Sequence, residues 1–140
     1  MQGNVPRLLN LALPLVLSLI AGSTDIIGFL GLNGLFTAHI TGNVVVLAAH
    51  VVAGDPAVLS YVLSVPVFML VLLLSRLFAG YLEHRRIATL QPLLLLQLIF
   101  LVGFLVLGVS GGGPFQSQST LGITAGMCGV TAMAVQTAIE

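Results

Sequence analysis

Long apolar stretches fill almost the whole of this 140-residue chain, and charged side chains are rare. Apolar residues make up 58% of the sequence, and Asp, Glu, Lys and Arg together make up 6%, against about 25% in an ordinary soluble domain. Four basic and four acidic residues cannot cover the surface of a soluble fold of this size. The sequence therefore predicts an integral membrane protein whose main partner is the lipid bilayer, formed as a single transmembrane domain over residues 1–140.

Five apolar segments are long enough, or nearly so, to cross a bilayer as helices, which takes roughly 20 residues because lipid cannot satisfy an open backbone. Their expected bounds are about 8–32, 36–53, 55–82, 92–109 and 119–140. Asp55 suits an N-cap and Pro56 a first helical residue of the third segment. Residues 111–114, Gly-Gly-Gly-Pro, are the strongest loop signal. We expect an all-α, polytopic transmembrane bundle of about five spans.

The first two segments carry features that interrupt helices. Pro14 and a polar stretch that ends at Asp25 lie in the first segment, and Thr41-Gly42-Asn43 lies in the second. Glycine and asparagine tolerate backbone conformations that other residues avoid. We therefore expect these two segments to be kinked or broken. Broken helices at membrane depth expose backbone groups that often bind ions or small polar solutes.

The arginines give conflicting indications of the orientation in the membrane. The positive-inside rule places Lys and Arg in cytoplasmic loops. Arg7 precedes the first segment and Arg85 with Arg86 follows the third, so three crossings would put these groups on opposite sides. Two arginines against one favour a cytoplasmic Arg85–Arg86 loop. Alternatively, a re-entrant or broken segment among the first two would bring all three to one side.

Asp25 is the most informative single residue, because it lies deep in the first apolar segment. A carboxylate at bilayer depth costs roughly 3 kcal/mol on insertion scales, so such groups usually face a cavity or a partner. One interpretation is a proton or cation site. The other is that Asp25 caps a broken helix or forms a hydrogen bond with a neighbour such as Asn43.

The second segment carries a polar stripe of its own. His39 and Asn43 are four residues apart, and His50 follows His39 by eleven, so a continuous helix would place all three on one face. We expect that face to point into the bundle, where Thr41, Gly42 and Asn43 would line a polar pathway. The alternatives are hydrogen bonds between helices, and for His50 a place at the membrane interface.

The remaining polar and small residues favour packing roles. Gly122, Gly126 and Gly129 form a small-residue face on the last segment. Gln97 and Gln136 are single amides suited to bonds between helices. Arg76 is expected to extend toward the interface or to pair with Asp25. A catalytic set, a metal-binding spacing and a phosphate-binding loop are missing from the sequence. We expect no enzyme activity, no metal, no cofactor and, at zero net charge, no nucleic-acid partner.

The stretch from Ala21 to Leu30, Ala-Gly-Ser-Thr-Asp-Ile-Ile-Gly-Phe-Leu, is followed by His-Ile-Thr-Gly-Asn at 39–43. It resembles the opening of the YoaK family, bacterial multi-pass membrane proteins classed as a domain of unknown function. The matching positions are Asp25, Gly28, Phe29, Thr41, Gly42 and Asn43, and Ile40 stands where the family has methionine. The stretch 134–138 resembles a later Gln-Asn-Ala element, with Thr137 in place of asparagine. The resemblance implies the N-terminal part of such a protein, in the bacterial cytoplasmic (inner) membrane.

Together these features favour a small-solute or ion transporter. Asp25 would couple transport to protons, His39 would be its proton partner, and Thr41, Gly42 and Asn43 would line the site. The alternative is a membrane interaction or scaffold protein whose polar residues join helices. Five helices are few for enclosing a polar pathway, so we also expect a homo-oligomer.

Overall fold

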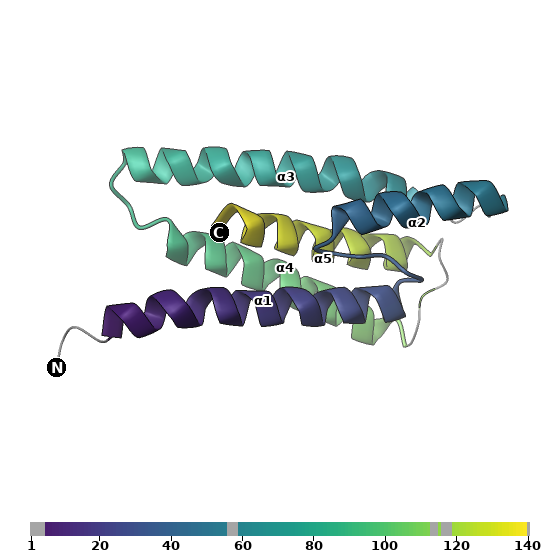
Figure 1. Ribbon diagram of the computed structural model, residues 1–140, viewed down its shortest axis with the longest axis horizontal. Coiled ribbons are helices and arrows are strands. Elements are labelled where there is room, and N and C mark those ends of the chain that lie inside the picture. The colour runs from purple at the N-terminus through teal and green to yellow at the C-terminus, as the bar shows by residue number, and fades with distance from the viewer. Residues whose placement is uncertain (1–4, 56–58, 113–114, 116–118, 140) are drawn as a thin grey trace.

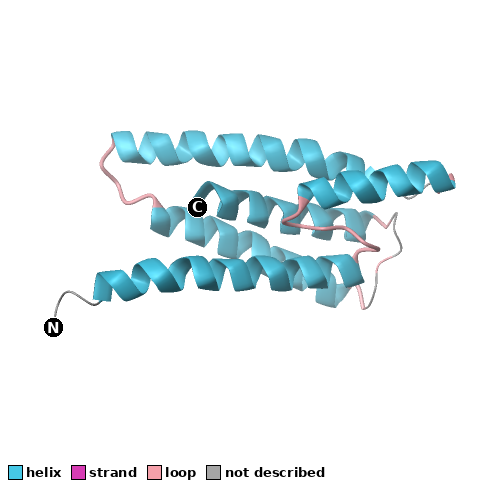
Figure 2. Ribbon diagram, in the orientation of Figure 1, coloured by secondary structure: helices cyan, strands magenta, loops and turns pink. Residues whose placement is uncertain are grey.

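The structure is a computed structural model that describes residues 5–55, 59–112, 115 and 119–139, with side chains from Ala12 onward. Its described part contains five α-helices and no strand (Figure 2). They are α1 (Val5–Gly31), α2 (Ile40–Ala53), α3 (Leu59–His84), α4 (Leu90–Ser110) and α5 (Thr120–Ile139). The expected all-α bundle is confirmed. Pro56, Gly113 and Pro114, which we expected at a helix start and in a loop, lie outside the described residues.

Four of the helices, α1, α3, α4 and α5, are long and apolar enough to cross a membrane. Helix α2 has only 14 residues, about 21 Å at 1.5 Å per residue, which is less than the hydrocarbon thickness of a bilayer. The expected helix from residue 36 begins only at Ile40. The break that we expected at Thr41–Asn43 therefore lies earlier, in residues 32–39, and Thr41–Asn43 belong to the first turn of α2.

Helix α2 begins beside the last part of α1 and runs outward past the end where α1 finishes (Figure 1). Figure 1 shows α1 running the length of the bundle, residues 32–39 turning back along it, and α2 running outward again. Helices α3, α4 and α5 then each run along the bundle in alternating directions. Residues 32–53 are thus a re-entrant segment, which enters and leaves at one end.

This path brings the arginines to one end of the molecule. Helix α1 begins at the end where Arg85 and Arg86 join α3 to α4, here called the arginine end (Figure 1). The opposite end, where Asp55 follows α2, is here called the Asp55 end. The re-entrant segment removes one crossing, so the conflict among the arginines disappears.

Helix α5 is the centre of the bundle. More than half of its residues are buried, whereas α3 and α4 bury only a few of theirs. Its buried face carries Gly122, Ala125, Gly126 and Gly129, and small residues let neighbouring backbones approach closely. The outward faces of α1, α3 and α4 are large exposed apolar side chains, among them Leu19, Leu73 and Val106. A belt of this kind suits contact with lipid.

Candidate functional site

The re-entrant segment begins with a tight turn. Asn33 and Gly34 both have positive φ, 57° and 90°, which reverses the chain after α1. The Gly34 N–H donates to the Phe29 carbonyl at 2.8 Å and so satisfies one of the last carbonyls of α1. From α3, the Tyr61 hydroxyl donates to the Asn33 carbonyl. These contacts fix the point where the chain turns back into the bundle.

Residues 35–37 of the re-entrant segment pack where the neighbouring helices have glycine. A Cβ atom added at Gly28 of α1 would lie 3.0 Å from the Thr37 methyl carbon. One added at Gly129 of α5 would lie 2.7 Å from the same methyl, and one at Gly126 would lie 2.6 Å from Leu35 Cδ2. The small-residue face of α5 thus packs against the re-entrant segment as well as against other helices. Gly122 contacts Phe115 and Ser119 instead.

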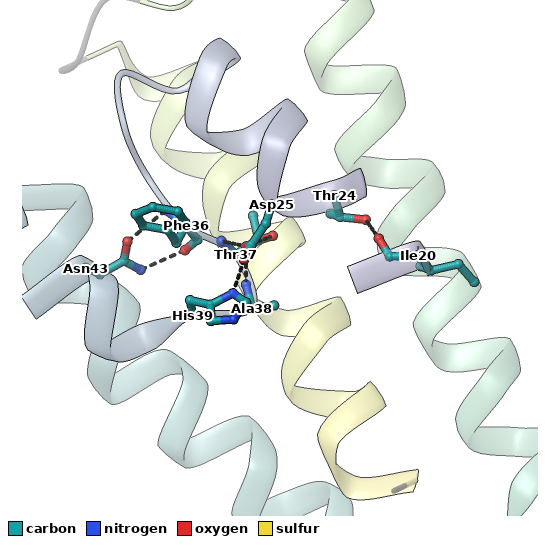
Figure 3. Close-up of polar contacts among 8 residues, drawn as sticks. All are labelled: Ile20, Thr24, Asp25, Phe36, Thr37, Ala38, His39 and Asn43. Carbon is teal, nitrogen blue, oxygen red and sulfur yellow. Dashed lines mark hydrogen bonds and ion pairs between the residues drawn. The ribbon is translucent and has the colours of Figure 1, made fainter. Parts of the chain in front are cut away.

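Asp25 joins α1 to the inner tip of this segment. The residue is 5% exposed. Its Oδ1 atom accepts hydrogen bonds from Thr37 N at 2.7 Å, Thr37 Oγ1 at 3.0 Å and Ala38 N at 2.6 Å. Its Oδ2 atom pairs with His39 Nδ1. Figure 3 shows these donors converging on the one carboxyl group. The Asn43 partner suggested from the sequence is therefore wrong.

The position of Asp25 also suits the dipole of α2. His39 is the N-cap residue of α2, and its φ and ψ of −101° and 78° are not helical. The N–H groups that reach the carboxylate, from Thr37 and Ala38, lie directly before this cap. A helix N-terminus carries a partial positive charge, which stabilises a nearby anion. The Asp25 carboxylate therefore lies where the dipole of α2 favours a negative charge.

His39 is the accessible member of the pair, with a side chain that is 70% exposed. It lines two hollows, of about 480 Å³ and about 330 Å³. The larger is lined by Gly22, Asp25, Ile26, Phe36, His39, Thr41 and Gly42. The smaller is lined by Ser18, Ala21, Gly22, Ala38, His39, Met133, Gln136 and Thr137. The His39 imidazole therefore lines both hollows, and its Nδ1 atom pairs with the Asp25 carboxylate.

Asn43 is fully buried and holds the other side of the segment. Its Oδ1 accepts from Phe36 N at 2.8 Å, and its Nδ2 donates to Phe36 O at 2.7 Å (Figure 3). The same Nδ2 donates to Ser64 Oγ of α3 at 3.1 Å. These bonds occupy both ends of the amide. Asn43 thus fixes Phe36 and lines neither of the two hollows around His39.

The expected polar stripe on α2 is present only in part, because Asn43 and His50 both contact α3 whereas His39 does not share their face. Asn43 is buried, Thr41 and His39 are exposed, and His50 is partly exposed near the Asp55 end. Thr41 and Gly42 line the larger hollow with Asp25 and His39. An added Cβ at Gly42 would lie 2.9 Å from the Phe36 ring, so glycine lets that ring cover the first turn of α2. The stripe is incomplete because His39 precedes the helix.

The residues missed from the sequence are Thr37, Ala38 and Ser64. Two of the three donors to Asp25 Oδ1 are backbone N–H groups, which leave no side-chain signal in a sequence. Thr37 is 0% exposed and Ser64 is 0% exposed. The Thr37 hydroxyl, in an apolar stretch twelve residues after Asp25, is a signal that could have been used.

The two glutamines form a bridge across three helices. Gln97 Nε2 donates to Gln136 Oε1 at 2.7 Å, and Gln136 Nε2 donates to the Leu17 carbonyl of α1 at 2.8 Å. Arg76 donates to the Thr137 carbonyl at 3.1 Å and remains exposed, so it contacts α5 and not Asp25. Among the described residues, no group of three or more His, Cys, Asp or Glu side chains could hold a metal ion.

Comparison with known proteins gives one match. A family model described as a protein of unknown function, DUF1275, matches residues 13–140, which is nearly the whole chain. Neither the curated proteins nor the solved structures contain a significant match.

Proposed function

We propose that this chain, which belongs to the DUF1275 family of proteins of unknown function, is a non-enzymatic integral membrane transporter. It would move a small polar solute or an ion, coupled to protons through the Asp25–His39 pair. The observation that carries the proposal is a buried carboxylate in a membrane-spanning helix, paired with an exposed histidine at the inner tip of a re-entrant segment.

The hydrogen bonds around Asp25 allow its carboxylate to stay buried while the charge of the neighbouring His39 changes. With His39 protonated, the pair is neutral overall. When His39 loses its proton, three donors still bond Asp25 Oδ1, so the carboxylate is not left unsatisfied. An uncompensated buried charge is strongly destabilising, and these donors avoid that cost. In this proposal Asp25 orients the imidazole, and His39 exchanges the proton with the two hollows.

The resemblance to YoaK proteins supports placement in the bacterial cytoplasmic membrane. With the arginine end in the cytoplasm, the re-entrant segment would enter from the outer side. His39 would then stand at the inner tip of a path open to that side, and the smaller hollow would continue from it along α1 and α5.

The test is proton movement in proteoliposomes loaded with a pH-sensitive dye. A panel of inorganic ions and small polar solutes is added outside, one at a time. We expect one class to change the internal pH with the wild type and not with His39→Gln or Asp25→Asn. The control is His84→Gln, which alters a histidine in the last turn of α3. A response that His39→Gln leaves intact would remove this pair from the mechanism.

The second candidate is a non-transporting interaction or scaffold protein, and a specific observation favours it. Asp25, Asn43 and Gln136 each form hydrogen bonds to a different part of the bundle, as structural groups do. In that case no solute in the panel would raise the melting temperature of the wild type. A ligand that binds only the folded state raises apparent stability, so a thermal-shift screen separates the two candidates.

A further inference from the structure

A second polar cluster lies at the Asp55 end, apart from the Asp25–His39 pair. His50 is in the last turn of α2, and its Nδ1 lies 3.0 Å from Asp55 Oδ2. The side chains of His50 and Asp55 are 21% and 43% exposed. The His50 ring stacks on the Tyr61 ring of α3, with centroids 5.2 Å apart and planes at 25°.

The backbone at the end of α2 builds this cluster. Gly54 adopts a left-handed conformation at φ 72°, and the Asp55 N–H donates to the His50 carbonyl at 3.0 Å. A glycine in this conformation closes a helix and folds the next residue back over the last turn. The C-cap of α2 therefore places the Asp55 side chain next to His50.

Tyr61 connects the cluster to the re-entrant segment. Tyr61 is 2% exposed, and its hydroxyl donates to the carbonyl of Asn33. Asn33 and Gly34 are the two positive-φ residues of the turn that starts the segment. A Cβ added at Gly34 would lie 3.2 Å from the Tyr61 oxygen, so the turn and the tyrosine are in close contact. One aromatic ring thus contacts His50 on its face and the turn at its hydroxyl.

We propose that His50, Asp55 and Tyr61 form a proton-responsive latch that holds the Asn33–Gly34 turn against α3. The titratable groups that face His50 are Asp55, from the loop after α2, and Tyr61, from α3. A protonated His50 donates a charge-assisted hydrogen bond to Asp55, which is stronger than the neutral bond. It also places a cation against the Tyr61 ring. Both changes strengthen the contact between His50 and the Tyr61 ring, and the hydroxyl of this ring binds the Asn33 carbonyl.

The test is hydrogen exchange of the amides in residues 32–39, with the full chain in lipid nanodiscs. Exchange is measured from about pH 8 to about pH 5.5, across the range in which histidine titrates, and is corrected for its intrinsic pH dependence. We expect the corrected exchange to slow by about fivefold toward the acidic end, the step from a neutral to a charged hydrogen bond. His50→Gln is expected to abolish this step, and Tyr61→Phe to speed exchange at every pH.

The controls separate this latch from the proposed transport site. His84→Gln removes a histidine outside both clusters and is expected to retain the step. His39 pairs with the carboxylate that binds the Thr37 and Ala38 N–H groups, so a step that disappears in His39→Gln and persists in His50→Gln would assign the step to the Asp25–His39 pair and overturn the proposal. Asp55→Asn keeps His50 but removes its anionic partner, so it is expected to reduce the step even if His50→Gln folds poorly. A step as large as that of the wild type in both His50→Gln and Asp55→Asn would overturn the proposal. Since exchange is read without a solute, a failed transport assay leaves this test unaffected.

Discussion

Thr37 donates both its backbone N–H and its hydroxyl to the same oxygen of Asp25, at 2.7 and 3.0 Å, although the two residues are twelve positions apart. Asp25 belongs to a membrane-spanning helix, and Thr37 to the non-helical part of the re-entrant segment. Non-helical backbone at membrane depth is tolerated only where protein or water satisfies it. The carboxylate therefore supplies acceptors for N–H groups that lipid could not satisfy.

Asp25→Asn is expected to destabilise the protein by about 2 kcal/mol, because a hydrogen bond to a charged group contributes about 1.5–3 kcal/mol. The amide retains one acceptor oxygen but loses the charge that faces His39 and the N-terminus of α2. The measurement is the unfolding free energy in detergent, with Glu83→Gln as the control at an exposed site. An unchanged unfolding free energy would show that the carboxylate does not hold the segment.

Thr37→Val and Thr37→Ser separate the contributions of the Thr37 hydroxyl and the Thr37 methyl group to the unfolding free energy. Valine keeps the methyl group but replaces the hydroxyl that bonds Asp25 by a second methyl, which is expected to cost about 1 kcal/mol. Serine keeps that bond but loses the methyl that packs against Gly28 and Gly129, a loss of about 1 kcal/mol for one buried carbon. Unfolding curves of both variants check this, and a neutral Thr37→Val would contradict the hydroxyl's assigned role.

The lengths of the apolar segments were sufficient to predict the helices, because bilayer thickness sets helix length and proline, glycine and charged clusters mark the ends. These lengths were insufficient to predict the direction in which α2 runs. The residue types at 36–39 do not distinguish a loop from the start of a helix. The sequence alone also does not reveal that Asp25 and Asn43 form hydrogen bonds with the backbone of this stretch. The arginine conflict and the helix-interrupting residues of the second segment were the indications of a re-entrant path.

The candidate site was predicted in part for the same reason. Asp25 and His39 stood out because ionisable groups are rare in apolar stretches, and the structure brings them together. Asn43 stood out equally but forms its bonds with Phe36 and Ser64. Helical spacing from His39 misassigned it, because His39 lies outside the helix whose periodicity was applied.

Gly129→Ala tests the packing of the re-entrant segment on α5. The added methyl would lie 2.7 Å from the Thr37 methyl, so it is expected to cost about 2 kcal/mol, as overpacking of a core does. Combining it with Thr37→Ser removes that contact, and the double variant is expected to recover at least half of the loss. Gly80→Ala is the control, because nothing lies within 4 Å of its added Cβ. Additive losses in the double variant would refute the contact.

The re-entrant path itself is tested by the side from which single cysteines are labelled. In a Cys128→Ser background, Asn33→Cys, Asp55→Cys and Glu83→Cys are placed after α1, after α2 and at the end of α3. A membrane-impermeant maleimide applied to intact cells is expected to label the first two and to leave Glu83→Cys unlabelled until the membrane is opened. Had α2 crossed the bilayer, Asn33 and Asp55 would face opposite sides. Opposite labelling of these two positions would therefore exclude the re-entrant segment, and with it the placement of His39 in the membrane interior.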